Sequence, residues 1–240
     1  MRRRLAVLAD QAGYGPDEPI VAGLQYGGRP PVLLARGSTP DGEPLGATTL
    51  AYTASLAKQM TAACAAQAAR QGELDLESPL SHLLPRLPAW ADAVRLRHLV
   101  HHTAGLPADA RIDALLGRDT DRTTEGVIQA LARFPAPDRE PGAEYAYSNA
   151  GYVCLAAVLE RALGRPLPDL ARSRLFTPLA MGRTRYWAGP GPAPPGAAPL
   201  VPPRPAPLSL GDGGVWSTAA DLLRWGRALN ADELGISALV

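Results

Sequence analysis

A serine and a lysine lie three residues apart in the segment Ser55-Leu-Ala-Lys58. This spacing places two side chains on the same face of an α-helix, close enough to touch. A lysine beside a serine hydroxyl can accept the hydroxyl proton and so make the serine a nucleophile for covalent catalysis. The pair therefore indicates a chemistry in which Ser55 is the nucleophile and Lys58 is its proton acceptor.

The lysine content of the chain strengthens this interpretation. Lys58 is the only lysine among 240 residues, and every other basic residue is an arginine. A GC-rich codon bias explains the excess of arginine, so the one exception is informative. Arginine cannot be deprotonated in a protein, whereas a lysine can lose its proton and act as a base. The Ser-x-x-Lys pattern alone is weak, and the single lysine is what favours a functional role.

A serine nucleophile also needs a group that passes the proton to the leaving atom, a donor that orients the substrate, and an oxyanion hole. The segment Tyr147-Ser-Asn149 can supply the first two. A tyrosine beside a cation can act as base or acid, and an asparagine amide can donate to a substrate carbonyl while it accepts from the lysine. On its own, the segment would be interpreted as a turn with an aromatic core residue, so its weight comes from the Ser-x-x-Lys pair.

The spacing of apolar residues and the turn signals predict several helices and two strands. The chain is long enough for one large domain or two closely packed ones. Its proline-rich stretch is predicted to be a loop and not a linker between independent domains, which favours a single domain over residues 1–240. Its expected parts are an N-terminal helix with two sheet strands in 1–50, a helical region in 51–187, a surface loop in 188–207 and a return segment in 208–240. The loop is predicted from its proline, glycine and alanine content, which disfavours helices and central strands. The expected helices are 1–14, 51–72, a short one ending at Leu84, 96–100, 123–134 with Thr124 as cap, 153–163, 167–175 and 219–229 with Thr218 as cap; the expected strands are 19–24 and 31–36.

Composition narrows the class of protein. Hydrophobic residues make up 46% and charged residues 20% of the chain, as in soluble globular proteins. A net charge of +1 with scattered arginines gives no case for nucleic-acid binding. Cys64 and Cys154 lie in apolar helical segments and are expected to be buried thiols. The apolar run 5–9 is shorter than the core of a signal peptide, and no stretch is long enough to cross a membrane, so we expect a cytoplasmic location.

Four segments of the chain occur in an order that is known from one protein family. They are Ala54-Ser55-Leu-Ala-Lys58-Gln, Leu96-Arg-His-Leu-Val-His-His-Thr-Ala-Gly-Leu-Pro107, Pro141-Gly-Ala-Glu-Tyr-Ala-Tyr147-Ser-Asn149-Ala-Gly-Tyr152 and Gly213-Gly-Val-Trp-Ser-Thr-Ala-Ala-Asp221. Together they resemble the serine beta-lactamase and penicillin-binding protein superfamily. The resemblance is to its class C-like branch, which includes esterases, D-amino peptidases, carboxypeptidases and acyltransferases.

The resemblance implies a beta-lactamase-like α+β fold, in which a mostly helical region lies beside an antiparallel sheet. It implies that Ser55 is acylated, with Lys58 as proton acceptor and electrostatic partner. It also implies that Tyr147 is the general base or acid and that Asn149 contacts a small-molecule ester or amide substrate. The Ser55 amide, at the start of a helix, would supply one donor of the oxyanion hole.

The resemblance also bears on cofactors. The spacing of His98, His101 and His102 allows a metal site to be considered. In the resembled segment, however, this region is a structural helix end and turn, and the family uses no metal or organic cofactor. We therefore expect no metal, no other cofactor, and no nucleic-acid or membrane partner.

One family motif has no counterpart in the sequence. The family carries a Lys- or His-x-Gly motif on a sheet strand, which supplies the second oxyanion donor and binds the acidic end of the substrate. It is expected after the Gly213-Gly214 pair, and the residues that follow contain nothing of the kind. We therefore expect an incomplete domain whose C-terminal sheet strands are missing, for which a separate C-terminal fragment would be the complementing partner.

These observations lead to one main functional interpretation and two alternatives. The main one is a serine hydrolase that acts through a Ser55 acyl-enzyme on an ester or amide, as an esterase, a D-amino peptidase or carboxypeptidase, or a beta-lactamase. An acyltransferase with the same acyl-enzyme is the first alternative, since it differs only in how well the site excludes water. A catalytically silent binding or remnant domain is the second. The missing motif favours it, and the presence of all four candidate site residues argues against it.

Overall fold

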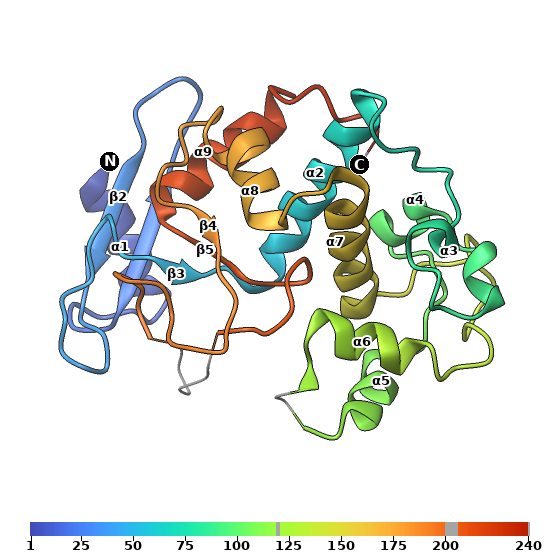
Figure 1. Ribbon diagram of the computed structural model, residues 1–240. Helices are drawn as coiled ribbons and strands as arrows, with labels where there is room; N and C mark the ends of the chain where they lie inside the picture. The colour runs from blue at the N-terminus through green and yellow to red at the C-terminus, as the bar shows by residue number, and fades with distance from the viewer. Residues whose placement is uncertain (119–120, 200–205, 240) are drawn as a thin grey trace.

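The computed structural model describes residues 1–118, 121–199 and 206–239, and within them the chain is mixed α and β (Figure 1). The helices are α1 (Arg2–Gln11), α2 (Ala57–Arg70), α3 (Leu80–Leu83), α4 (Leu96–Val100), α5 (Asp109–Leu116), α6 (Thr124–Leu131), α7 (Asn149–Leu163), α8 (Leu167–Ala171) and α9 (Ala219–Asn230). The strands are β1 (Ile20–Leu24), β2 (Val32–Arg36), β3 (Ala51–Tyr52), β4 (Arg185–Tyr186) and β5 (Val215–Ser217). The α+β class predicted from the sequence is confirmed.

Helices α2 and α7 form the centre of the helical part, and α3, α4, α5, α6 and α8 pack against α7 (Figure 1). Helix α2 is rich in alanine, and apart from Gln59 its side chains are buried from Ala57 to Ala68. Small side chains allow neighbouring helices to approach closely, because the distance between helix axes depends on the residues at the contact. Helix α7 ends at Leu163 and is followed by Gly164, whose left-handed φ of +64° is common just after a helix C-terminus.

Strands β1 and β2 lie where the sequence predicted two strands. They pair in antiparallel register, with Ile20 opposite Arg36. Helix α9 packs against β1, and α1 packs against β2. A Cβ atom on Gly23 of β1 would lie 2.9 Å from Leu223 Cδ1 of α9. The glycine therefore permits the close approach of this helix to the strand.

The second sheet has the strand order β3-β5-β4 and leads the chain into the Ser55 segment. Ala51 pairs with Ser217 and Tyr52 with Trp216, both in antiparallel register. The sequence predicted a helix that begins at Ala51, and this predicted start is wrong. The backbone of Ala51 and Tyr52 is instead paired with β5. The chain instead forms a 3-10 turn, η1 (Ala54–Leu56), and α2 begins at Ala57.

The start of α7 also differs from the prediction. The helix was expected from Val153, and it begins at Asn149. Ser148 is the N-cap, and its side-chain oxygen accepts a hydrogen bond from the Gly151 amide at 3.0 Å. Serine is among the best N-cap residues because its oxygen binds an amide that has no partner within the helix.

The caps of α6 and α9 were predicted with different success. Helix α6 is capped by Thr123, whose side chain accepts from the Gly126 amide at 3.0 Å, so the predicted cap at Thr124 is wrong by one residue. Helix α9 is capped by Thr218, as predicted, and its side chain accepts from the Asp221 amide at 3.2 Å.

Several short elements were not predicted, namely α5, the 3-10 turn η2 (Ala89–Asp92) and strands β3, β4 and β5. The helix expected over 167–175 is divided into α8 and a π-helical turn, η4 (Arg172–Phe176). The loop expected over 188–207 is irregular where it is described, and its residues 200–205 lie outside the described ranges. Cys64 and Cys154 are both buried free thiols, as expected.

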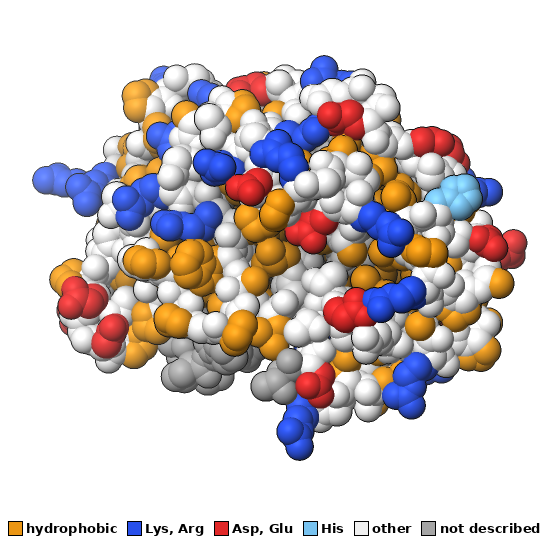
Figure 2. All heavy atoms as spheres, viewed as in Figure 1, with side chains coloured by type: hydrophobic (Ala, Val, Ile, Leu, Met, Phe, Trp, Pro, Cys, Tyr) orange, Lys and Arg blue, Asp and Glu red, His pale blue; other side chains and the backbone are white. Residues whose placement is uncertain are grey.

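The surface matches the near-zero net charge of the chain. Figure 2 shows basic and acidic side chains interspersed with apolar ones over the middle of the face in view. Of the helices in the described ranges, none combines the length and the apolar composition that a membrane span requires.

Candidate active site

Ser55 lies in a strained turn between strand β3 and helix α2. The residue before it, Ala54, has a φ of +46°, in the left-handed region that residues with a Cβ rarely adopt. Such backbone strain costs about 1–3 kcal/mol and is concentrated at functional sites. The turn places Ser55 just ahead of the first turn of α2, where backbone amides have no carbonyl partner within the helix.

Lys58 lies in the first turn of α2 and is 5% exposed. Its Nζ donates to Ser55 Oγ at 3.2 Å, to Asn149 Oδ1 at 2.7 Å and to the main-chain oxygen of Asp212 at 2.8 Å. A lysine ammonium has three N–H donors and no acceptor. The three contacts therefore satisfy the ammonium form of this side chain completely, which is what a buried charge requires.

Tyr147 faces the nucleophile from the segment that precedes α7. Its hydroxyl oxygen lies 2.8 Å from Ser55 Oγ, and either atom can be the donor. Lys58 Nζ lies 4.8 Å from the centroid of the Tyr147 ring, within the range of a cation–π contact. The Tyr147 hydroxyl and the Lys58 Nζ thus both contact Ser55 Oγ.

The imidazole ring of His102 packs against the ring of Tyr147. The two rings are stacked, with 4.7 Å between centroids and 28° between planes. The Nδ1 atom of His102 accepts from the backbone amide of Ser148 at 3.1 Å, so this nitrogen is the unprotonated one of a neutral imidazole. His102 itself has a left-handed φ of +56°. Its position on the tyrosine ring holds the 145–148 segment in place.

Asn149 is the first residue of α7, and its side chain connects two charged residues. Its Oδ1 accepts from Lys58 Nζ at 2.7 Å, and its Nδ2 donates to Asp109 Oδ2 at 2.8 Å. Asp109 is the first residue of α5. The structure therefore joins the starts of three helices, α2, α5 and α7, through one side-chain amide.

The surroundings shift the pKa values of several groups at this site. Burial lowers the pKa of His102, and the charge of Lys58 lowers it further. Burial raises the pKa of the Asp212 carboxyl, while the charges of Lys58 and Arg122 oppose this shift. Burial raises the pKa of Tyr152 to about 12, and its hydroxyl donates to the Val100 carbonyl at 2.8 Å.

The four site residues inferred from the sequence, Ser55, Lys58, Tyr147 and Asn149, lie together in the structure. Sequence reasoning did not find Asp109, although an acidic residue soon after Pro107 is a typical helix-start signal. It also did not find the contact between His102 and Tyr147, because His102 was considered only as a metal ligand or as part of a turn.

The histidines whose spacing allowed a metal site to be considered make other contacts in the structure. His98 Nδ1 accepts from the Arg95 amide at 3.1 Å, and His102 Nδ1 is occupied by the Ser148 amide. Among the residues that the structure describes, no three His, Cys, Asp or Glu side chains gather as metal ligands would.

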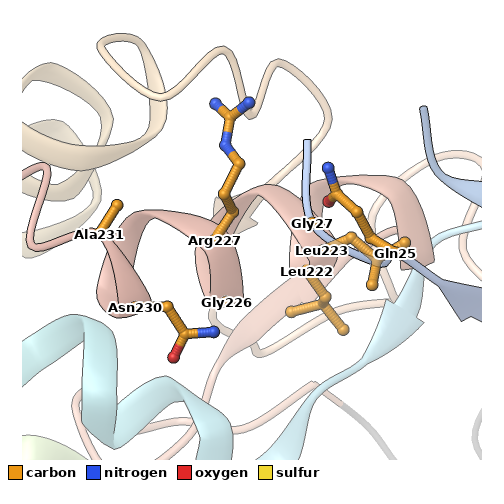
Figure 3. A pocket seen from close by; sticks show the side chains of 8 residues that line it. All are labelled: Gln25, Gly27, Leu222, Leu223, Gly226, Arg227, Asn230 and Ala231. Atoms are coloured by element: carbon orange, nitrogen blue, oxygen red, sulfur yellow. The ribbon is translucent and has the colours of Figure 1, made fainter. Parts of the chain in front are cut away.

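A cavity of about 400 Å³ lies between the end of β1 and helix α9 (Figure 3). Gln25 and Gly27 line it on one side, and residues of α9 together with the Ala231 that follows the helix line it on the other. None of the four site residues lines it. It offers no nucleophile paired with a base, so the candidate active site is identified by its chemistry and not by this cavity.

Comparisons with known proteins identify the family and several relatives of this chain. A family model described as Beta-lactamase matches residues 20–238. The D-alanyl-D-alanine-carboxypeptidase/endopeptidase AmpH of Escherichia coli (strain K12) is 29% identical over 243 residues, which cover 90% of this chain and 59% of AmpH. The chain thus spans less than two thirds of the length of this relative.

Solved structures show the same fold. The penicillin binding protein from Bacillus halodurans superposes with a TM-score of 0.79 at 23% identity, over 98% of this chain and 76% of that one. The D-amino acid amidase from Ochrobactrum anthropi SV3 superposes with a TM-score of 0.78 at 25% identity, over 95% of this chain and 70% of that one.

Proposed function

Because this chain belongs to the beta-lactamase family, we propose that it is a serine hydrolase that cleaves an ester or amide through an acyl-enzyme on Ser55. The observation that carries the proposal is the position of Ser55 Oγ, 2.8 Å from the Tyr147 hydroxyl and 3.2 Å from Lys58 Nζ. A nucleophile within hydrogen-bond reach of its base, with the base held by a further group, is the usual arrangement for covalent catalysis.

In the acylation step, Ser55 Oγ forms a bond to the substrate carbonyl carbon, and the π electrons of the carbonyl move to its oxygen. The proton of Ser55 passes to the Tyr147–Lys58 pair, and this transfer requires a free lone pair on the phenolic oxygen or on Lys58 Nζ. The pair then delivers that proton to the leaving nitrogen or oxygen as the bond to the carbonyl carbon breaks. Its two members share this role because both contact Ser55 Oγ.

In the deacylation step, a water molecule attacks the acyl carbon. It gives one proton to the same pair, and Ser55 regains a proton as its bond to the acyl group breaks. The negative oxygen that develops in each step is stabilised by N–H donors aimed at it. We assign one of these donors to the Ser55 amide, because the amides of a first helical turn lack intrahelical partners.

We further propose that the acyl part of the substrate is a D-amino acid residue. The support is that two similar proteins are named as a D-alanyl-D-alanine-carboxypeptidase/endopeptidase and a D-amino acid amidase. This preference is tested by comparing the cleavage of D-alanine p-nitroanilide with that of L-alanine p-nitroanilide. Faster cleavage of the L-isomer would contradict it.

The acyl-enzyme itself is tested by intact mass spectrometry of the chain after exposure to p-nitrophenyl acetate or to a penicillin. We expect an adduct of the acyl group that maps to Ser55 and is absent in Ser55→Ala. Circular dichroism establishes that both proteins are folded. A folded wild-type chain that forms no adduct with either reagent would refute the proposal and favour a non-catalytic binding domain.

A further inference from the structure

The carboxylate of Asp109 makes three hydrogen bonds to the first two residues of α7. Its Oδ2 accepts from the backbone amide of Asn149 at 2.8 Å and from the side-chain Nδ2 of Asn149 at 2.8 Å. Its Oδ1 accepts from the backbone amide of Ala150 at 3.1 Å. One carboxylate thus binds both the helix start and the side chain that contacts the catalytic lysine.

These contacts determine which way the Asn149 amide points. The amide has a donor at one end and an acceptor at the other. Since Nδ2 faces the Asp109 carboxylate, Oδ1 faces the opposite way, where it accepts from Lys58 Nζ at 2.7 Å. A flipped amide would place its oxygen against the carboxylate and its N–H groups against the ammonium, so both contacts would become repulsive.

We propose that Asp109 is a positioning residue of the active site, which holds the Asn149 amide so that its Oδ1 anchors Lys58. This inference rests on the proposed function. The second N–H of Asn149 Nδ2 then remains to donate to a substrate carbonyl. Asp109 acts through Asn149 and touches neither the nucleophile nor the substrate.

Asp109 also caps α7, and this second role must be separated from positioning in any test. Carboxylates at a helix N-terminus stabilise the helix through its unpaired amides and its dipole. Removal of Asp109 therefore lowers stability even if the Asn149 side chain keeps its place. A useful readout must report on Lys58 or on Ser55 chemistry and not on folding alone.

The single lysine of the chain provides such a readout. Protein labelled with ¹³Cε-lysine gives one side-chain signal, that of Lys58. We expect this signal to move in Asp109→Glu, which keeps the negative charge but displaces the carboxylate by one methylene group, and in Asp109→Asn. In an Asn149→Ala background, Asp109→Glu should leave it unmoved. Thr123→Ala, which removes the cap of α6, is the control for lost stability and should also leave it unmoved.

Kinetics provide the second readout. We expect Asp109→Asn to slow acylation of Ser55 by about tenfold or more, because a hydrogen bond to a charged group is lost. In the Asn149→Ala background, the same substitution should cause no further loss of rate, since residues that act as a unit are not additive. The loss of melting temperature, which reports capping, should be similar in both backgrounds.

The outcomes separate this inference from the proposed function. A Lys58 signal that moves only when Asn149 is present supports positioning, even if the wild-type chain acylates no reagent and the proposed function fails. A signal that stays in place in both Asp109 variants, or that moves equally in the Asn149→Ala background, overturns positioning, whatever the activity. Additive losses of acylation rate would overturn it as well.

A measurement on the wild-type chain keeps the test decisive if the Asp109 variants do not fold. One side-chain Nδ2 proton of Asn149, assigned by its absence in Asn149→Ala, should exchange with solvent more slowly than the amide protons of Asn230 at the end of α9. Exchange of both Asn149 protons at the rate of Asn230 would overturn the inference, because a fixed amide would be protected.

Discussion

Replacing Tyr147 with phenylalanine removes one oxygen atom from the candidate active site and leaves the ring in place. The lost hydroxyl lies 2.8 Å from Ser55 Oγ, and the ring keeps its stacking on His102. Because 48% of the Tyr147 surface is exposed, water can replace the lost hydrogen bond. We therefore expect the free energy of unfolding to change by less than about 0.5 kcal/mol.

The expected effect on acylation is much larger. Loss of a general acid–base group slows a reaction by about 100- to 10,000-fold, which corresponds to about 2.7–5.4 kcal/mol of activation free energy. The structure decides where in this range the variant falls. Lys58 Nζ is 3.2 Å from the same Oγ and as a neutral amine can take over part of the proton transfer, so we expect the lower end, about 100-fold.

The assay is single-turnover acylation by an activated ester, followed by intact mass. The control is Tyr145→Phe, since Tyr145 is 67% exposed and makes a T-shaped contact with the same His102 ring, with 5.6 Å between centroids. This control should acylate within about twofold of the wild type, as surface substitutions usually do. If Tyr147→Phe kept more than about a third of the wild-type rate, the assignment of Tyr147 to proton transfer would be refuted.

Three further predictions follow from the same geometry. Lys58→Met should slow acylation by about 100-fold or more, because it removes the positive charge beside the nucleophile; mass spectrometry of the acylated chain measures it, and near wild-type labelling would contradict it. Gly105→Ala should lower the free energy of unfolding by about 2 kcal/mol or more in urea titrations, since Gly105 has a φ of +66° and a Cβ there would overlap the Arg139 carbonyl oxygen. The lowered pKa of His102 means that the unfolded state binds more protons, so stability should fall as the pH drops through the ordinary histidine value of about 6.5. His102→Asn can keep an acceptor for the Ser148 amide and should weaken this pH dependence in urea titrations, and an unchanged dependence would contradict the reasoning.

Local chemistry made part of the site predictable. The contact between Ser55 and Lys58 was predicted from their spacing. It forms although Ser55 lies in the 3-10 turn before α2, because side chains three residues apart also lie on one face of a 3-10 turn. The meeting of Lys58 with Asn149 depends on the packing of α2 against α7, and the sequence indicated it only through the chemical needs of a serine nucleophile and through the resemblance to a family. The spacing of residues along one helix does not predict which residues of another helix they contact.

The parts that were missed depend on contacts between distant segments. Strand β3 contains two residues, and they are in a strand only because β5 pairs with them. Nothing in its two residues distinguishes them from the start of a helix. Asp109 is similar, since its carboxylate acquires a role only when α5 brings it to the start of α7. The sequence shows that residue 109 is acidic, but it does not show that Asp109 contacts Asn149.

The meeting of two helix starts explains the electrostatics of the site. The N-termini of α2 and α7 each carry a partial positive charge, and they converge on the ammonium of Lys58. Three positive groups in a partly buried space would repel one another. The Asp109 carboxylate at the start of α7 and the Asp212 carbonyl on Lys58 oppose this repulsion without touching Ser55. The Lys58 ammonium remains in hydrogen-bond contact with Ser55 Oγ, and a positive group at this place favours the negative oxygen that develops when Ser55 attacks a carbonyl.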